Sequence, residues 1–312
     1  MKRWFFLAFD HRNSFMTQFL GLKGPPSDRD RELARRAKIL IFEALNAEIN
    51  RSPLANAEPA VLVDALYGRD VVDRARAAHI KCSIPLERSG QDELTFETDP
   101  FYRHLEELEP DFAKVLIRYN PGGDRDLNAR QRDKLLDVQQ YCAREGIGLI
   151  VELLVPPTDS QLCSVADGFH GYDIRLRPAL GVEAIGELVD SGVDPDLWKL
   201  EGVSNQAEFA ALADRARRFS QRFCGCLLLG RGSDAEAVME WIHAAAPVEG
   251  YVGFAVGRTL WWDPLAQWLR GALSCEDAKL AIGTNYRALV DRYIGAISID
   301  REARLQRLTM EN

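Results

Sequence analysis

Two lysines stand inside short apolar segments, where charged side chains are unusual. A lysine removed from water beside a second cation loses its proton more easily than a solvated one, and its neutral amine attacks ketones to form a Schiff base. Lys199 is the candidate nucleophile and Lys114 the candidate neighbouring cation. Glu152 or Glu201 would carry protons. The structural alternative is a plain ion pair between Lys199 and one of these glutamates.

The apolar segments carry further charges that share one face. Side chains alternate along a strand, so Lys199 and Glu201 face one way, and Trp198 and Leu200 face the other. The charges within or at the ends of these segments are Asp10, Asp64, Glu87, Lys114, Arg118, Glu152, Lys199 and Glu201. Burying unpaired charge is costly, so we expect this face to pair internally or to bind a ligand.

Two glycine-rich turns, each ahead of a predicted helix, resemble phosphate-binding loops. Gly230, Arg231 and Gly232 form the first turn, and Gly257 with Arg258 ends the second. Glycines let backbone amides approach a phosphate closely, and a helix N-terminus favours an anion. Arg258 is the preferred charge partner, because Arg231 can point outward.

Strand and helix patterns alternate eight times along the chain. The strand-like segments are Trp4–Asp10, Ala60–Leu66, Lys81–Glu87, Ala113–Asn120, Gly148–Pro156, Leu197–Glu201, Cys224–Gly230 and Tyr251–Arg258. The clearest helical segments are Asp28–Asn50, Asn128–Glu145, Gly181–Ser191, Asn205–Arg222, Ser233–Ala246, Pro264–Gly271 and Cys275–Ser298. This order predicts an α/β fold, a single (β/α)₈ TIM barrel, with a doubly wound open sheet as the competitor. We expect one domain over 1–312, with the barrel at about 3–297 and a tail at 298–312.

Composition narrows the classes of function. The 312 residues hold 47 acidic and 39 basic side chains, a net charge of −8, which argues against nucleic-acid binding. No apolar run is long enough to span a bilayer, and the start lacks a signal-peptide pattern, so a cytoplasmic protein is expected. The six cysteines show no disulfide or metal spacing and are expected to be reduced.

His11 is the one histidine that the pattern places at the end of a strand. With Asp10, Glu87 and Glu152 it leaves open an oxygen-rich metal site, although no paired-histidine motif supports one. The main prediction needs neither metal nor cofactor. A homo-oligomer is left open: the helix with Trp261, Trp262, Leu265 and Trp268 could form an interface or cover the barrel bottom.

Several motifs together resemble one family. They are Leu7–Phe15 (LAFDHRNSF), Pro85–Gln91 (PLERSGQ), Lys114–Pro121 (KVLIRYNP), Glu152–Pro157 (ELLVPP), Trp198–Gly202 (WKLEG) and Gly253–Thr259 (GFAVGRT). The chain resembles, from about residue 3 to residue 297, the barrel domain often fused to the C-terminus of 5-dehydro-2-deoxygluconokinase in myo-inositol catabolism. That domain is related to class I aldolases of the tagatose-bisphosphate and sulfofructose-phosphate type. No kinase segment precedes the barrel here, so a stand-alone member is expected.

The resemblance implies cleavage of 2-deoxy-5-keto-gluconate 6-phosphate to dihydroxyacetone phosphate and malonate semialdehyde. It implies Lys199 as the Schiff-base lysine and a phosphate site at Gly230–Gly232 and Gly257–Arg258. We expect Glu152 or Asp10 as the base, and Arg118 or Arg88 as the partner of the substrate carboxylate. The alternatives are a metal-dependent lyase or isomerase, a non-catalytic sugar-phosphate sensor, and a purely structural barrel subunit.

Overall fold

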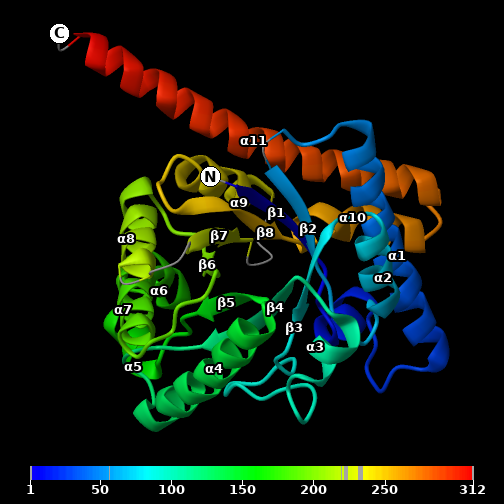
Figure 1. Cartoon of the computed structure of the whole chain (residues 1–312), viewed down its shortest axis with the longest axis horizontal. Coiled ribbons are helices and arrows are strands. Elements are labelled where there is room, and N and C mark those ends of the chain that lie inside the picture. Colours follow the sequence, from blue (N-terminus) through cyan, green and yellow to red (C-terminus); the bar gives the residue numbers. More distant parts are fainter. Residues whose placement is uncertain (1, 56, 219, 221–223, 231–234, 311–312) are drawn as a thin grey trace.

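Eight parallel strands form a closed barrel (Figure 1). The computed structural model describes the chain except residues 1, 56, 219, 221–223, 231–234 and 311–312, and describes 302–310 by their backbone. The strands are β1 (Arg3–Ala8), β2 (Ala57–Leu62), β3 (Lys81–Pro85), β4 (Phe112–Arg118), β5 (Gly148–Leu154), β6 (Leu197–Glu201), β7 (Gly225–Leu229) and β8 (Tyr251–Val256). All eight predicted strands are confirmed, most of them ending a few residues earlier than predicted.

Helices surround this barrel on the outside (Figure 1). They are η1 (Phe15–Phe19), α1 (Asp28–Arg51), α2 (Arg69–Ala77), α3 (Arg103–Leu108), α4 (Arg125–Glu145), α5 (Asp159–Ser164), α6 (Gly168–Arg175), α7 (Arg177–Asp190), α8 (Gln206–Arg217), α9 (Ala235–Ala245), α10 (Arg258–Leu269) and α11 (Cys275–Met310). The last helix runs beyond Ser298, where the sequence pattern ended it. None of the helices in the described part of the chain is long and apolar enough to cross a membrane.

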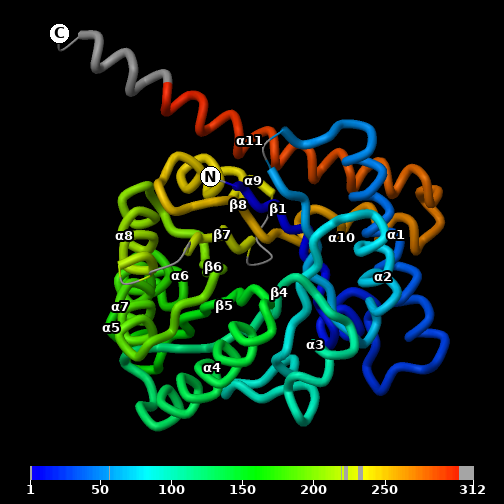
Figure 2. The backbone as a smooth tube through the Cα atoms, in the orientation of Figure 1, coloured from blue at the N-terminus to red at the C-terminus, as the bar shows by residue number. Residues whose placement is uncertain are grey.

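The ring closes because the first strand pairs with the last. Each strand pairs in parallel with its neighbour in sequence, and β1 also pairs with β8 through Leu7 and Val256. The trace in Figure 2 follows this order from the blue β1 round to β8, which lies beside it. A doubly wound sheet would leave two open edges, so that competitor is excluded.

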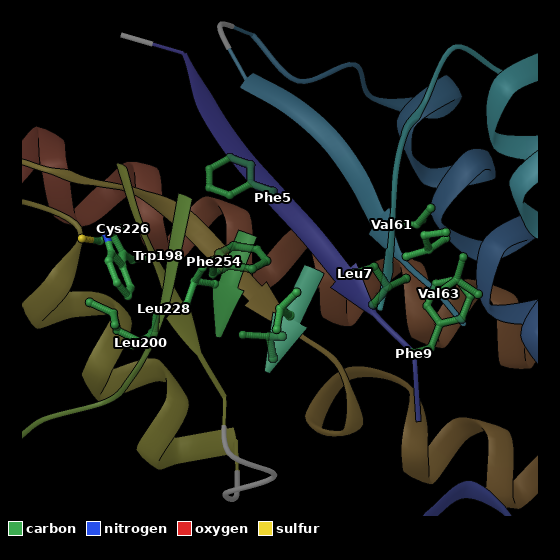
Figure 3. Packing of buried hydrophobic residues seen from close by; sticks show 14 of the residues in the cluster. Phe5, Leu7, Phe9, Val61, Val63, Trp198, Leu200, Cys226, Leu228 and Phe254 are labelled. Carbon is green, nitrogen blue, oxygen red and sulfur yellow. The ribbon is translucent and has the colours of Figure 1, made fainter. Parts of the chain in front are cut away.

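Strand alternation separates two apolar layers. Outward residues such as Phe5, Trp198 and Phe254 pack with the helices in the larger core (Figure 3). Inward residues form a second, smaller core inside the barrel. At its N-terminal end, Trp4 lies edge-on to Phe112 with their ring centroids 5.2 Å apart. Aromatic side chains therefore fill the bottom of the barrel, and the inward charges gather at the opposite end.

Side-chain oxygens cap the helices next to the strand ends. Ser27 caps α1 and forms a reciprocal capping box with Asp30. At α8 the cap is Asn205, whose side-chain oxygen accepts the hydrogen bond from the Glu208 amide, at 3.1 Å. An asparagine oxygen reaches the third amide of a helix as well as a serine hydroxyl does.

Asp64 does not join the charges inside the barrel. β2 ends at Leu62, so strand alternation no longer directs the Asp64 side chain. One Asp64 carboxylate oxygen accepts the amides of Leu66 and Tyr67, and the other pairs with the fully buried Lys38 of α1. Lys38 also donates to the carbonyl of Phe9, at 2.7 Å. This ion pair therefore ties α1 to the ends of β1 and β2.

The aromatic helix α10 does not cover the barrel bottom. Trp261 is fully buried, and its indole nitrogen donates to the carbonyl of Ala8, at the C-terminal end of β1. Leu265 is likewise fully buried, so these two side chains belong to the core and not to an interface. The six cysteines are free, with Cys163 and Cys275 exposed and the other four buried.

Replacing Lys38 should destabilise the protein strongly. Lys38→Met leaves the Asp64 charge buried without its partner, which costs about 3–5 kcal/mol, and Lys38→Met with Asp64→Leu should recover much of that loss. Urea unfolding measures both. The matched control is Lys2→Met, which removes an exposed pair with Glu58 and should cost about 0–1 kcal/mol. Equal effects of the two single substitutions would contradict the structural role given to Lys38.

Candidate active site

A cavity of about 430 Å³ opens at the C-terminal ends of the strands. This is the end where the loops of a (β/α)₈ barrel build active sites. The charged and histidine side chains that line it are Asp10, His11, Arg12, Glu87, Lys114, Arg118, Glu152, Arg177, Lys199, Glu201 and Arg258. Inward charges of different strands therefore meet at one mouth, and Asp64 is the member of the predicted set that does not reach it.

Lys114 lies at the centre of the charged cluster. Its ammonium nitrogen is 2.6 Å from Glu152 Oε2, 2.8 Å from Glu87 Oε1 and 3.4 Å from Asp10 Oδ2. The side chain is 2% exposed, so water does not screen these contacts. The second oxygen of Glu87 accepts the backbone amide of Leu116, at 3.1 Å. Three carboxylates from three parts of the chain thus surround one buried ammonium group.

Lys199 reaches the same cluster from β6. Its amine donates to Glu152 Oε2 at 3.0 Å, the oxygen that Lys114 also contacts. The two lysines therefore bracket one carboxylate oxygen, as the register of β5 and β6 requires, since Glu152 lies opposite Lys199. A ketone in the cavity would meet a lysine amine, a carboxylate and a second cation together.

The acidic and basic side chains of the cluster stabilise each other's charged forms. Burial alone raises the pKa of Asp10, but the charges of Lys114 and Lys199 outweigh burial and hold that pKa well below its ordinary value. The same balance of burial against Lys114 and Lys199 lowers the pKa of Glu152. For Lys114, burial favours the neutral form, but the three carboxylates raise its pKa above the ordinary value. Asp10 and Glu152 are therefore ionised, and Lys114 is a fixed cation.

The residues predicted to bind a phosphate group lie at the ends of β7 and β8 and at the start of α10, which is called the phosphate end of the cavity below. Gly230, Gly257 and Arg258 line the cavity, and α10 begins at Arg258, so its first amides face this end. A side chain at residue 257 would place its Cβ 1.9 Å from the carbonyl oxygen of Ala8, so only glycine fits there. Arg231 and Gly232, the other two residues of the prediction, lie outside the described residues.

The two arginines predicted for a substrate carboxylate differ in position. Arg118 lines the main cavity and donates to the carbonyl of Gln91, at 2.6 Å. Arg88 is exposed and lines instead an adjoining side pocket of about 110 Å³, which Arg118 also lines. Arg88 is not among the residues that line the main cavity, so Arg118 is the arginine of this pair that reaches it. Arg118 connects the two spaces.

Glu201 faces the cavity but is engaged differently from Glu152. One of its carboxylate oxygens accepts the amide of Val155 at 3.1 Å and lies 4.0 Å from Arg177. Arg177 also donates to the carbonyl of Gly202, at 2.7 Å. Glu201 thus ties the loop after β5 to the end of β6, which gives it a positioning contact in addition to its predicted place in the site.

Two arginines of the cavity were missed by the sequence reasoning. Arg177 starts α7 and resembles an ordinary helix residue in the sequence. Arg12 donates to the carbonyl of Glu87 at 2.6 Å and to the carboxylate of Glu97 at 2.9 Å, so it fixes the loop after β3. Its position directly after Asp10 and His11 was the available signal.

The carboxylates of the metal alternative are paired with lysine. Within the described residues, no group of three or more histidine, cysteine or acidic side chains is arranged to hold a metal ion. Asp10, Glu87 and Glu152 direct oxygens at Lys114, and the Nδ1 of His11 has no hydrogen-bond partner there. The Lys114 ammonium group occupies the position between these carboxylates that a metal ion would have to take.

Removing the central cation should change how stability depends on pH. In the wild type, the lowered pKa values of Asp10 and Glu152 contribute stability above their ordinary values, and that contribution is lost as the pH falls through the folded-state values. In Lys114→Met, burial raises these carboxyl pKa values, so the variant loses stability as the pH rises. We expect a loss of about 3–5 kcal/mol near pH 7 that shrinks toward about pH 5.

Urea unfolding at several pH values measures this difference. The control is Lys81→Met, which removes a partly exposed pair with Asp111 and should show a small loss that hardly changes with pH. A loss for Lys114→Met that stays constant over this pH range would contradict the electrostatic role of Lys114.

Comparison with solved structures identifies the barrel. Fructose-bisphosphate aldolase from Plasmodium falciparum, solved with TRAP and a small-molecule inhibitor, is similar with a TM-score of 0.66 and 15% identity, over 93% of this chain and 90% of that one. An archaeal fructose 1,6-bisphosphate aldolase gives a TM-score of 0.56 and 14% identity over 94% of each chain. A Schiff-base-forming fructose-1,6-bisphosphate aldolase gives 0.52 and 16%, over 90% of this chain and 93% of that one. At these identities the likeness shows the fold.

Sequence comparison gives the family. No curated protein matches the chain. One family model, described as "Uncharacterized protein conserved in bacteria (DUF2090)", matches residues 1–296. That match spans every strand of the barrel and every described residue of the cavity. The chain therefore belongs to the DUF2090 family.

Proposed function

We propose that the protein is a class I aldolase in which Lys199 forms a Schiff base with a phosphorylated keto sugar acid. The observation that carries this proposal is the contact of the Lys199 amine with Glu152, whose oxygen also contacts the buried cation Lys114. A nucleophilic amine, a base and a fixed cation around one cavity are the groups that carbon–carbon cleavage next to a ketone needs. The barrel shared with fructose-bisphosphate aldolases is consistent with it.

The order of strands suggests where the substrate ends would lie. Lys199 stands on β6, which is two strands from β8 and two strands from β4 in the closed ring. The β8 side presents Gly257 and Arg258, and the β4 side presents Arg118. A substrate with a phosphate at one end, a carboxylate at the other and a ketone between them matches this arrangement. We propose 2-deoxy-5-keto-gluconate 6-phosphate as that substrate.

The reaction follows from these groups. The Lys199 amine adds to the ketone, and loss of water gives an iminium ion. Glu152 or Asp10 takes the proton of the hydroxyl that lies two carbons from the iminium carbon. The bond between this carbinol carbon and the carbon next to the iminium carbon breaks, the carbinol carbon becomes the aldehyde, and the bonding electrons form an enamine on Lys199. Malonate semialdehyde leaves. The enamine carbon regains a proton, and water releases dihydroxyacetone phosphate. Lys114 stabilises negative charge that develops in the cavity.

We propose that the protein acts in the cytoplasm, as expected from the sequence, on a small phosphorylated molecule. The barrel closes within one chain, so a homo-oligomer is not needed to complete the sheet. A metal-dependent lyase would lose its activity to a chelator, whereas the proposed reaction proceeds in its presence. A sugar-phosphate sensor would bind the same ligands without forming an adduct.

Borohydride trapping tests the Schiff base. Incubating the protein with dihydroxyacetone phosphate and borohydride should leave one covalent adduct, which peptide mapping places on Lys199. Lys199→Met should give none, because Lys114, the other lysine that lines the cavity, is held as a cation by its three carboxylates. The matched control is Lys81→Met, a lysine at the opposite end of the barrel, which should be trapped like the wild type. Binding of phosphate without any adduct would rule out the class I mechanism.

Substitution of Arg118 should weaken the binding of a ligand with a carboxylate and leave the binding of a ligand without one unchanged. Arg118→Met removes the proposed carboxylate partner, so KM for the keto acid phosphate should rise about tenfold to a hundredfold, as for loss of a hydrogen bond to a charged group. Trapping by dihydroxyacetone phosphate, which has no carboxylate, should keep its concentration dependence. Arg88→Met is the control, since that side chain is outside the main cavity. Equal losses with both ligands would contradict the assignment.

A further inference from the structure

His11 is a cavity residue that the proposed reaction does not use. It lies three residues beyond β1 and lines the same cavity as Lys199 and Arg258. Its ring packs edge-on against Trp261, with 5.7 Å between the centroids. The ring nitrogen Nδ1 is buried, and within the described residues it has no hydrogen-bond partner. A buried polar nitrogen without a partner is costly, so the site calls for a partner that the protein itself does not supply.

The main chain and α10 hold the imidazole at the phosphate end. β1 pairs with β8, so the residues that follow these two strands lie next to each other at the mouth. The carbonyl of His11 accepts the Lys38 ammonium at 2.9 Å, which fixes its backbone. Trp261, against which the ring packs, belongs to the helix that begins at Arg258 and is anchored to the Ala8 carbonyl at 3.0 Å.

The imidazole is uncharged in the free protein. Burial lowers the pKa of His11 to about 4, the charges of Arg258, Lys38 and Lys199 act in the same direction, and the charge of Asp10 opposes them. At neutral pH the ring therefore offers one N–H donor and one acceptor nitrogen. Such a donor adds a hydrogen bond to an anion without adding a second positive charge that would repel Arg258.

We propose that His11 is a substrate-binding residue that donates a hydrogen bond to the phosphate group bound at Gly257 and Arg258. This inference rests on the proposed function for the identity of the ligand's charged end. Phosphate binding by itself does not require the Schiff base, so an experiment can refute either proposal without refuting the other. His11 thereby extends the phosphate site from β8 to β1.

Inorganic phosphate tests this contact without any chemistry at Lys199. In protein labelled with ¹⁵N-histidine, the His11 ring signals are identified by their absence in His11→Leu, and they should shift when phosphate is added. The affinity for phosphate, measured by calorimetry, should fall about tenfold to a hundredfold in His11→Leu. His11→Gln, which keeps an N–H donor, should retain most of the affinity. His104→Leu, a half-buried histidine of α3 outside the cavity, is the matched control.

A second comparison separates phosphate binding from a general effect on the site. The concentration needed for half-maximal borohydride trapping should rise in His11→Leu with dihydroxyacetone phosphate and stay unchanged with dihydroxyacetone, which has no phosphate. Equal increases for both ligands would overturn the inference, as would wild-type phosphate affinity in His11→Leu or ring signals that do not respond to phosphate. If His11→Leu fails to fold, His11→Gln and the wild-type spectra still decide the outcome. Phosphate binding that depends on His11, without any adduct, would retain this inference and refute the aldolase.

Discussion

The buried ammonium group of Lys114 is the interaction on which the candidate site depends. Asp10, Glu87 and Glu152 come from three strand ends and could not share one cavity as anions without a cation between them. The cluster in turn sets the position of Lys199, because Glu152 directs a single oxygen at both lysines. Stability and the geometry of the proposed nucleophile therefore rest on the same charge.

The closed barrel makes this cluster feasible. Apolar side chains face the helices and fill the bottom of the barrel, so the inward polar groups meet only at the strand ends where the cavity opens. The loops around this mouth have different structural roles. Glycine at 257 admits the first turn of α10, whereas Arg12 and Arg177 hold the loops on the other strands in place. A rigid ring with separately adjustable loops suits a site that must hold both ends of one ligand.

Membership in the DUF2090 family and the aldolase-like barrel give different kinds of information. A barrel fold hosts many reactions, so the reaction has to be inferred from the side chains at the mouth. Two lysines around one glutamate oxygen favour carbonyl chemistry. The cations on either side of Lys199 favour a ligand with two anionic ends. The same reasoning gives His11 a role, because a neutral donor next to Arg258 suits a phosphate.

The sequence by itself determined the barrel and the inward face of its strands, because alternation fixes which side chains share a face while the backbone is extended. Lys114, Glu152, Lys199 and Glu201 were predicted on that basis. Only the tertiary structure decided what lies beyond the strand ends: there the chain turns, alternation stops, and long-range contacts take over. Asp64 consequently pairs with a helix, Arg88 lines a side pocket, and Arg177 enters the cavity from α7.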